Sequence, residues 1–224
     1  MRILKINLNN LRESIGAISE AVETIKNGGA IVYPTDTIYG LGVNALNGEA
    51  ISRLFKIKRR PMEKAVPVIV NSIEMARKIA YIDYRKDEML GKIWSASAKA
   101  SAGKPGPITI VLHKKDVLPD ILTGMRDTIG IRIPESKLAR ILISSLGAPI
   151  TATSANISGE EPSLDIQTII DRFNQVNDKP DLILDAGILP PSEPSTILDL
   201  SGQKPKILRI GPVKKEQLLD ILSF

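Results

Sequence analysis

The amino-acid sequence predicts an α/β fold built on a mixed β-sheet. Helix-like and strand-like segments alternate along most of the 224 residues, which is the pattern of α/β domains. Near the end, strand-like runs at 182–184, 195–200 and 207–210 follow one another without a helix between them, which favours a mixed sheet over a doubly wound parallel one. We find no internal repeat and no convincing linker, so we predict a single domain over residues 1–224.

The first half of the chain carries signals for four helices and two strands. Asn10, with Glu13 three residues later, begins the first helix in the manner of a capping box, and Gly28-Gly29 ends it. The predicted elements are, in order, a helix over 10–27, a strand over 30–33, a helix over 49–57, a strand over 66–70, a helix capped by Ser72 and a helix over 83–94.

The second half begins with a break in this pattern. Residues 95–104 are rich in Ser, Ala, Gly and Lys, so we predict a mobile low-complexity loop there. The predicted elements after this loop are strands over 108–112 and 128–134, a helix over 138–145 that Gly147 ends, a helix over 165–173, the three strands named above and a helix over 214–222.

Two polar stretches follow predicted strands. Residues 151–159 hold five hydroxyl or amide side chains, and the small Ala152 and Ala155 leave room for a ligand near the backbone. In residues 34–42, Asp36 lies between two threonines and two glycines follow. Strand ends, helix caps and ordinary turns use the same residue types, so from these residues alone a ligand site and a plain connection both remain open.

A run of cations ends the predicted helix before residue 61. Four of the five residues at 56–60 are Lys or Arg, and cations at a helix C-terminus complement the helix dipole. The alternative is that Lys58 and Arg60 reach a triphosphate, because Arg binds phosphate through two donors and Lys supplies a point charge. We expect both side chains to face solvent.

Arg132 lies within an apolar strand. It stands between two isoleucines in the run 128–134, and an unpaired buried charge is costly, so we expect it to have an anionic partner. The partner is either a carboxylate of the protein or the carboxylate of a substrate.

Composition excludes several kinds of site. The chain has no Cys and one His, too few for a zinc site or a Ser-His-Asp triad, and we interpret His113 as a strand-end residue. No apolar run approaches the ~20 residues of a membrane helix, and the N-terminus lacks a signal peptide, so we expect a cytoplasmic protein without a membrane contact. The net charge of +5 fits an anionic ligand such as a nucleotide, or weak contact with RNA.

Six motifs, taken together and in order, resemble the YrdC/TsaC family, and the resemblance covers about residues 10 to 213. The motifs are Pro34-Thr35-Asp36-Thr37-Ile38-Tyr39-Gly40-Leu41-Gly42, Lys58-Arg59-Arg60-Pro61, Pro105-Gly106-Pro107-Ile108-Thr109, residues 127–134, Thr153-Ser154-Ala155-Asn156-Ile157-Ser158-Gly159 and Pro194-Ser195-Thr196-Ile197-Leu198-Asp199. The resemblance implies a twisted mixed sheet flanked by helices around a basic concave cavity.

The resemblance also implies an activity. Family members make threonylcarbamoyl-AMP and pyrophosphate from L-threonine, bicarbonate and ATP, with Mg²⁺ held mainly by the ATP phosphates, and the product serves a downstream tRNA threonylcarbamoyl transferase complex. Carried over by position, the implied ATP contacts are Lys58, Arg60, Thr128, Ser154, Asn156, Ser163 and Arg209. The implied threonine contacts are Thr35, Arg132, Ala152 and Ser195, with Arg132 the natural partner of the substrate carboxylate.

The chain departs from the family pattern in places, and two other functions compete. The usual Trp-Pro-Gly-Pro run is interrupted here, because residues 95–104 separate Trp94 from Pro105. The chain resembles the short members, which lack an additional C-terminal domain. The first alternative is a non-catalytic module of the same fold that binds double-stranded RNA or tRNA. The second is a carbamoyl-transfer domain like those of hydrogenase-maturation proteins.

Overall fold

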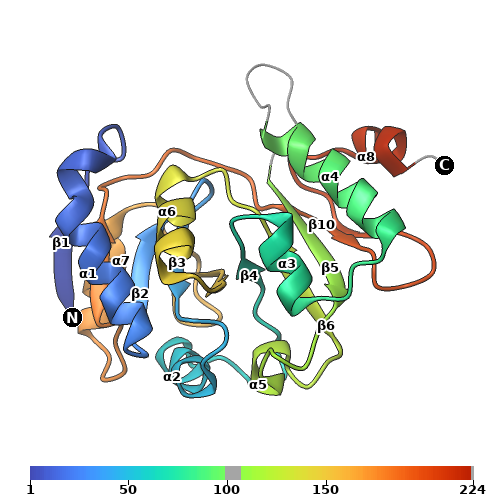
Figure 1. The fold of residues 1–224 in the computed structure, drawn as a ribbon. Coiled ribbons are helices and arrows are strands. Elements are labelled where there is room, and N and C mark those ends of the chain that lie inside the picture. Colours follow the sequence, from blue (N-terminus) through green and yellow to red (C-terminus); the bar gives the residue numbers. More distant parts are fainter. Residues whose placement is uncertain (99–106, 223–224) are drawn as a thin grey trace.

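The strands form two mixed sheets that lie next to each other in a computed structural model, which describes residues 1–98 and 107–222 (Figure 1). The first sheet has the order β1 (Arg2–Lys5), β9 (Leu182–Asp185), β2 (Ile31–Pro34), β3 (Tyr39–Gly42) and β8 (Thr153–Ser154). In it β9 runs parallel to both β1 and β2, whereas β3 is antiparallel to its neighbours β2 and β8.

The second sheet also mixes the two strand directions. Its order is β11 (Lys206–Arg209), β10 (Thr196–Asp199), β5 (Ile108–His113), β6 (Thr128–Arg132), β4 (Val68–Ile69) and β7 (Ile150–Thr151). The pairs β10 with β5 and β6 with β4 are parallel, and the other three pairs are antiparallel. The predicted α/β class with mixed strand directions is confirmed, with the strands divided between two sheets.

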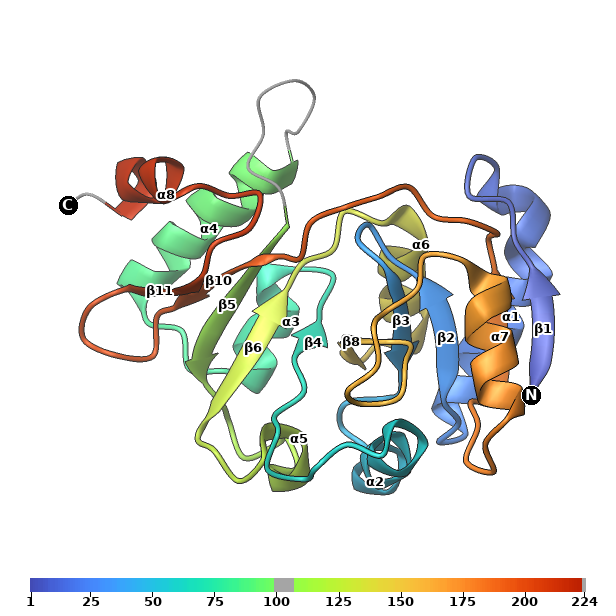
Figure 2. The same ribbon diagram turned by 180° about the vertical axis from the view of Figure 1, so that it is seen from behind.

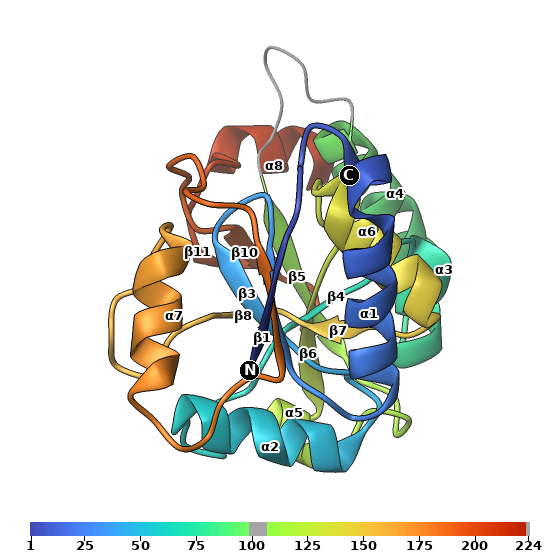
Figure 3. The same cartoon turned by 90° about the vertical axis from the view of Figure 1, so that its left-hand side faces the viewer.

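Two helices cover one face of the first sheet. A 3₁₀ turn at Leu11–Ser14 leads into α1 (Ile15–Lys26), which packs beside α6 (Lys137–Leu146) (Figures 1 and 3). Apolar side chains repeat along α1 at helical spacing and enter the same buried cluster as Ile31 of β2; they are Ile18, Val22 and Ile25. The helix therefore holds its place by burying its apolar stripe.

The other helices surround the larger apolar cluster. Here α2 (Gly48–Lys58) contacts α5 (Asp120–Thr123), and α4 (Tyr84–Ala98) contacts both α3 (Ile73–Ile79) and α8 (Lys215–Leu222) (Figure 2). On the other side of the first sheet from α1 lies α7 (Ile166–Asn174) (Figure 3). The predicted cap is confirmed, because Ser72 Oγ accepts from Met75 N at 3.2 Å.

The segment Ile150–Ser154 joins the two sheets. Its first two residues form β7 in the second sheet, and its last two form β8 in the first. Ala152 N, between them, donates to Pro67 O at 2.8 Å. Thr151 is fully buried, and its Oγ1 accepts from Val43 N at 3.0 Å while Tyr33 Oη donates to its carbonyl at 3.1 Å. The central polar stretch of the sequence therefore begins where the two sheets meet, and we call residues 150–156 the seam.

The structure corrects some predicted elements. Residues 95–98 continue α4 rather than forming a loop, because Ala and Ser are compatible with a helix when no Gly or Pro interrupts them; residues 99–104 lie outside the described part of the chain. The prediction also missed β1, which is a mostly exposed edge strand, and treated β3 as part of a loop. Within the described ranges, no helix is long and apolar enough to cross a membrane.

We expect Gly42→Ala to destabilise the fold by about 1–3 kcal/mol, because a methyl group there overpacks the core between the sheets. The added Cβ would lie 2.7 Å from Tyr33 Cε1 and 2.8 Å from Ile150 Cγ2. Urea unfolding measures the loss. The matched control is Gly91→Ala within α4, where nothing lies within 4 Å, and it should stabilise by roughly 0.5–1 kcal/mol. Equal stability of the two variants would contradict this account.

Candidate active site

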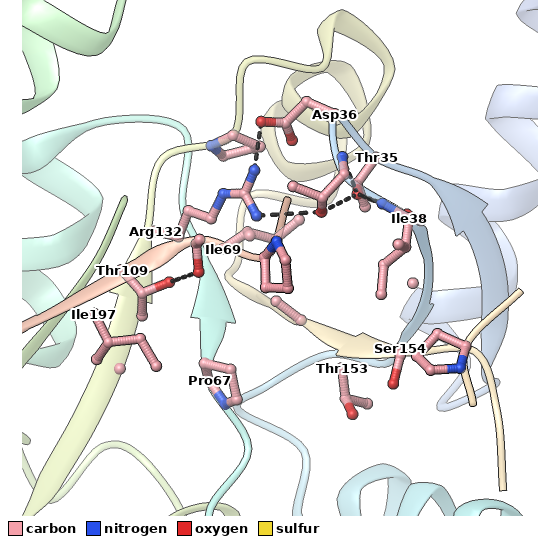
Figure 4. A pocket seen from close by; sticks show the side chains of 18 of the residues that line it. Thr35, Asp36, Ile38, Pro67, Ile69, Thr109, Arg132, Thr153, Ser154 and Ile197 are labelled. Carbon is pink, nitrogen blue, oxygen red and sulfur yellow. Dashed lines mark hydrogen bonds and ion pairs between the residues drawn. The ribbon is translucent and has the colours of Figure 1, made fainter. Parts of the chain in front are cut away.

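A cavity of about 610 Å³ opens where the two sheets meet (Figure 4). The turn between β2 and β3 and the seam residues 152–154 line one part of it. Side chains of β5, β6, β10 and β11 in the second sheet line another part. The walls of the cavity are thus formed by elements that are far apart in the sequence.

Seven residues with a ligand role implied by the resemblance line this cavity. From the ATP set they are Arg60, Ser154 and Arg209, and from the threonine set they are Thr35, Arg132, Ala152 and Ser195. Three of the seven are arginines, and the one acidic residue in the lining of the cavity, as far as the described residues go, is Asp36. The charge of the lining therefore favours anionic ligands.

The first polar cluster in the cavity is an ion pair between β6 and the turn after β2. Arg132 Nη2 contacts Asp36 Oδ2, and the two side chains are 11% and 14% exposed. Arg132 Nη1 also lies 3.4 Å from Thr37 Oγ1 (Figure 4). The protein itself thus supplies a carboxylate for the buried cation, which is one of the two partners that the sequence left open.

The turn that carries Asp36 is held by its own threonines. Thr35 Oγ1 donates to Ile38 O at 2.6 Å and accepts from Thr37 N at 3.1 Å. The two threonine hydroxyls are 3.1 Å apart. These bonds explain why threonine flanks the carboxylate on both sides, since hydroxyl side chains stabilise such turns.

The second polar cluster joins β5 and β11 to Ser195, the residue before β10. Thr109 Oγ1 and Ser195 Oγ are 2.9 Å apart, and Arg209 donates to Ser195 twice, from Nε to the carbonyl at 2.9 Å and from Nη2 to Oγ at 3.2 Å. Burial, together with the nearby charge of Arg132, lowers the pKa of Arg209 from its usual value. Both arginines line the cavity, so an anionic ligand there can contact either of them.

Arg60 and Ser154 line a further part of the cavity. The half-buried Arg60 donates from Nε to Lys64 O at 3.0 Å and from Nη2 to Ala65 O at 2.8 Å, which keeps its guanidinium at the cavity wall. Ser154 Oγ donates to Asn156 Oδ1 within the seam.

Lys58 is buried, so the expectation that it faces solvent was wrong. The residue is 1% exposed, and its Nζ donates to Ser154 O at 2.5 Å, Asn156 O at 2.8 Å and Asn156 Oδ1 at 3.1 Å. Burial, and to a smaller extent the charge of Arg60, lower its pKa to about 7. Lys58 thus supports the seam from behind Ser154. The sequence prediction singled out Lys58 and Arg60 and expected both to face solvent, but in this run Lys56 and Arg59 are the exposed cations and Arg60 is half-buried.

Other predicted residues lie away from the lining. Asn156 is buried and bonded to Lys58, Thr128 pairs with His113 at the start of β6, and Ser163 Oγ accepts from Asp165 N at 3.1 Å before α7. His113 ends β5, as the sequence predicted, with Nε2 3.0 Å from Ser201 O.

Known proteins resemble this chain in sequence and fold. A family model for Sua5, YciO and YrdC proteins, described as "Telomere recombination", matches residues 23–211. The chain belongs to the Sua5/YciO/YrdC family. The match includes the turn after β2, the cation run, the seam and β11, so every wall of the cavity lies within it.

Named relatives and a solved structure extend the comparison. A Pyrococcus abyssi protein named threonylcarbamoyl-AMP synthase is 34% identical over 96% of this chain, which spans 60% of that relative. A Hydrogenovibrio crunogenus protein of the same name is 31% identical over 84% of this chain and 95% of its own length. The crystal structure of P. abyssi Sua5 complexed with L-threonine has a TM-score of 0.84 at 31% identity, and the match covers 100% of this chain and 61% of that one.

Some polar residues of this Sua5/YciO/YrdC cavity were not among the predicted contacts. Asp36, Thr37, Thr109, Thr153 and Ser192 all line it. Ser192 Oγ donates to Thr37 O, which ties the proline-rich segment before β10 to the turn after β2. Asp36 was visible in the sequence as a carboxylate between two threonines, whereas nothing in the sequence around Ser192 indicates that it reaches across to the first sheet.

We expect Lys58→Met to lower the free energy of unfolding by about 1–3 kcal/mol, because it leaves buried carbonyl and amide oxygens without their donor. Urea unfolding at pH 7 measures the loss. The matched control is Lys56→Met, an exposed position on the same helix, which should change stability by less than ~0.5 kcal/mol. A Lys58→Met variant as stable as this control would contradict the supporting role of Lys58.

The stability contributed by Lys58 should also depend on pH. Its folded-state pKa of about 7 lies below the value of 10.5 for an unperturbed lysine, so between these pH values the unfolded chain binds more protons than the folded chain. The free energy of unfolding of the wild type should therefore rise, relative to Lys58→Met, as pH increases through this window. Unfolding curves at pH 7.0 and 9.5 test the sign, and a narrowing difference would contradict it.

Proposed function

We propose that this chain is a threonylcarbamoyl-AMP synthase, a nucleotidyltransferase that uses L-threonine, bicarbonate and ATP and releases pyrophosphate. The observation that carries the proposal is the cavity, which gathers Arg60, Arg132, Ser154, Ser195 and Arg209 from separate parts of the chain. Its support from relatives is the 34% identity to a named synthase over 96% of this chain and the threonine complex of a Sua5 protein with the same fold.

The reaction needs positioning and charge neutralisation more than a protein nucleophile. The threonine amine, after losing a proton, forms a bond to the carbon of bicarbonate, and hydroxide leaves with a proton as water, giving a carbamate. A carbamate oxygen then bonds to the α-phosphorus of ATP as the bond to the bridging oxygen breaks, and pyrophosphate leaves with that electron pair. All three substrates carry negative charge, so holding them together is the main task of the site.

The geometry distributes this task over the three arginines. Arg132, held by Asp36 beside the hydroxyls of the turn, suits the threonine carboxylate, with Ser195 and Thr35 near it. Arg60 and Arg209 suit the phosphates, because both are cations in the lining whose donors are held in a fixed orientation by hydrogen bonds. Lys58 and Asn156 act from behind, by holding the backbone of Ser154 in place.

Magnesium fits this site as part of the substrate MgATP. Among the described residues no group of three or more His, Cys, Asp or Glu side chains is arranged to hold a metal ion, and Asp36 in the cavity is already paired with Arg132. Such a donor set suits an ion bound mainly by phosphate oxygens, which would help to neutralise them.

The reactivity of the product determines which class of reaction must consume it. Threonylcarbamoyl-AMP is a mixed anhydride, so it must be consumed promptly by an acyl acceptor. We infer that it passes to a tRNA threonylcarbamoyl transferase complex in the cytoplasm, with the family resemblance as the support for this step.

The deciding experiment measures pyrophosphate release by the purified protein with MgATP and bicarbonate. We expect release that depends on L-threonine, with little in its absence and less with serine, because one methyl group is worth about 1–3 kcal/mol of discrimination. No release of pyrophosphate, together with tight binding of double-stranded RNA, would indicate a non-catalytic binding module rather than a synthase. Release that required carbamoyl phosphate instead would indicate a carbamoyl-transfer domain.

We expect Arg132→Lys to raise the KM for threonine by roughly 10–100-fold, because a lysine cannot form the two-donor contact of a guanidinium with a carboxylate. The KM for ATP should change by less than ~3-fold if Arg132 serves threonine alone. Initial rates of pyrophosphate release give both constants. The control is Arg140→Lys, which replaces a half-buried arginine outside the cavity lining that bonds Pro134 O at 2.7 Å. A larger effect on ATP than on threonine would contradict the assignment.

A further inference from the structure

Asp36 holds Arg132 in the cavity, but no step described so far gives Asp36 itself a contact with a substrate. It is the one carboxylate that the described residues contribute to a lining with three arginines. Its side chain is 14% exposed and lies on the turn between β2 and β3, next to Arg132 (Figure 4). Pairing with Arg132 accounts for one carboxylate oxygen of Asp36, so the other oxygen needs a separate reason.

The ion pair leaves one unpartnered atom on each side. Asp36 Oδ2 contacts Arg132 and lies 3.3 Å from Glu135 N, whereas Asp36 Oδ1 is buried without a hydrogen-bond partner. Arg132 Nε is likewise buried without a partner. Buried polar atoms are nearly always hydrogen-bonded, so each such atom calls for an explanation. The two atoms belong to the same ion pair and are complementary, because one is an acceptor and the other a donor.

A ligand with neighbouring carboxylate and ammonium groups would satisfy both atoms. Its carboxylate would accept from Arg132, and its ammonium would donate to Asp36. The two atoms are covered in the free protein, so binding requires the two side chains to turn toward the cavity they line. A simple carboxylate would leave Asp36 Oδ1 unpartnered and would meet the repulsion of a second carboxylate beside Arg132.

We propose that Asp36 makes the cavity select a zwitterionic amino acid over a carboxylate that lacks an amino group. It receives the ammonium of the substrate and holds the guanidinium of Arg132 for the carboxylate. This inference rests on the proposed function and deepens it, since it explains how a cavity rich in arginine also accepts the cationic end of threonine.

The test compares binding of L-threonine with binding of 3-hydroxybutanoate, which is threonine without its amino group. Isothermal titration calorimetry gives both dissociation constants for the wild type, Asp36→Asn and Asp36→Glu. The control is Asp87→Asn, which replaces a carboxylate of α4 that forms a bidentate pair with Arg77 of α3, away from the cavity lining. Thermal unfolding shows that each variant is folded.

The proposal predicts a change in the ratio of the two dissociation constants rather than an equal loss of affinity for both ligands. Asp36→Asn should reduce the preference for threonine over 3-hydroxybutanoate by ~10-fold or more, as expected for a lost charge-assisted contact, and leave ATP affinity within ~2-fold. Asp36→Glu should retain much of the preference, and Asp87→Asn all of it.

Three outcomes would overturn the proposal. An equal loss of affinity for both ligands in Asp36→Asn would mean that Asp36 only orients Arg132. Unchanged affinities for both ligands would mean that Asp36 does not contact the amine. Either result would leave the synthase assignment standing. If the wild type does not bind threonine at all, the proposed function fails and this inference fails with it.

Discussion

The hydrogen bonds that the segment Ile150–Ser154 makes to both sheets are the constraint on which the rest of the structure depends. The backbone pairs with β4 through its first two residues and with β3 through its last two, and Ala152 N bonds Pro67 between them. Buried backbone polar groups must find partners, so this chain of bonds fixes the position of one sheet relative to the other. The cavity exists because the seam sets that position and Lys58 supports it from behind.

The cations around the cavity have two different roles: the arginines present charge to the cavity, and Lys58 stabilises the backbone behind it. Arg60, Arg132 and Arg209 remain at its wall, held by carbonyls, hydroxyls or a carboxylate, and their donors are ordered before a ligand arrives. Such ordering reduces the cost of binding and strengthens each contact in a partly dry site. Lys58, in contrast, is surrounded by oxygen atoms of the seam and contributes rigidity rather than an open charge.

Local signals in the sequence predicted most helices, the strands with strong apolar runs and the polar stretches at the cavity. The Ser72 cap and the strand before the turn at residues 35–38 needed only neighbouring residues to be predicted. Features that depend on distant pairing were missed: β1 has mostly exposed residues and is a strand only because β9 lies beside it, and the partner of Arg132 is 96 residues away. Burial of Lys58 was also unpredictable from spacing, because its acceptors belong to the seam.

The order of strands in the first sheet has a consequence for how the chain is made. Leu182–Asp185 lies between β1 and β2, although both of those strands leave the ribosome long before it. A nascent chain that has reached residue 150 therefore exposes the edge of β2 and its apolar Ile31 and Val32 with no strand to cover them. Contacts of such long range form slowly and leave strand edges open to wrong pairing. During synthesis, this edge of β2 therefore stays unpaired until residues 182–185 have emerged.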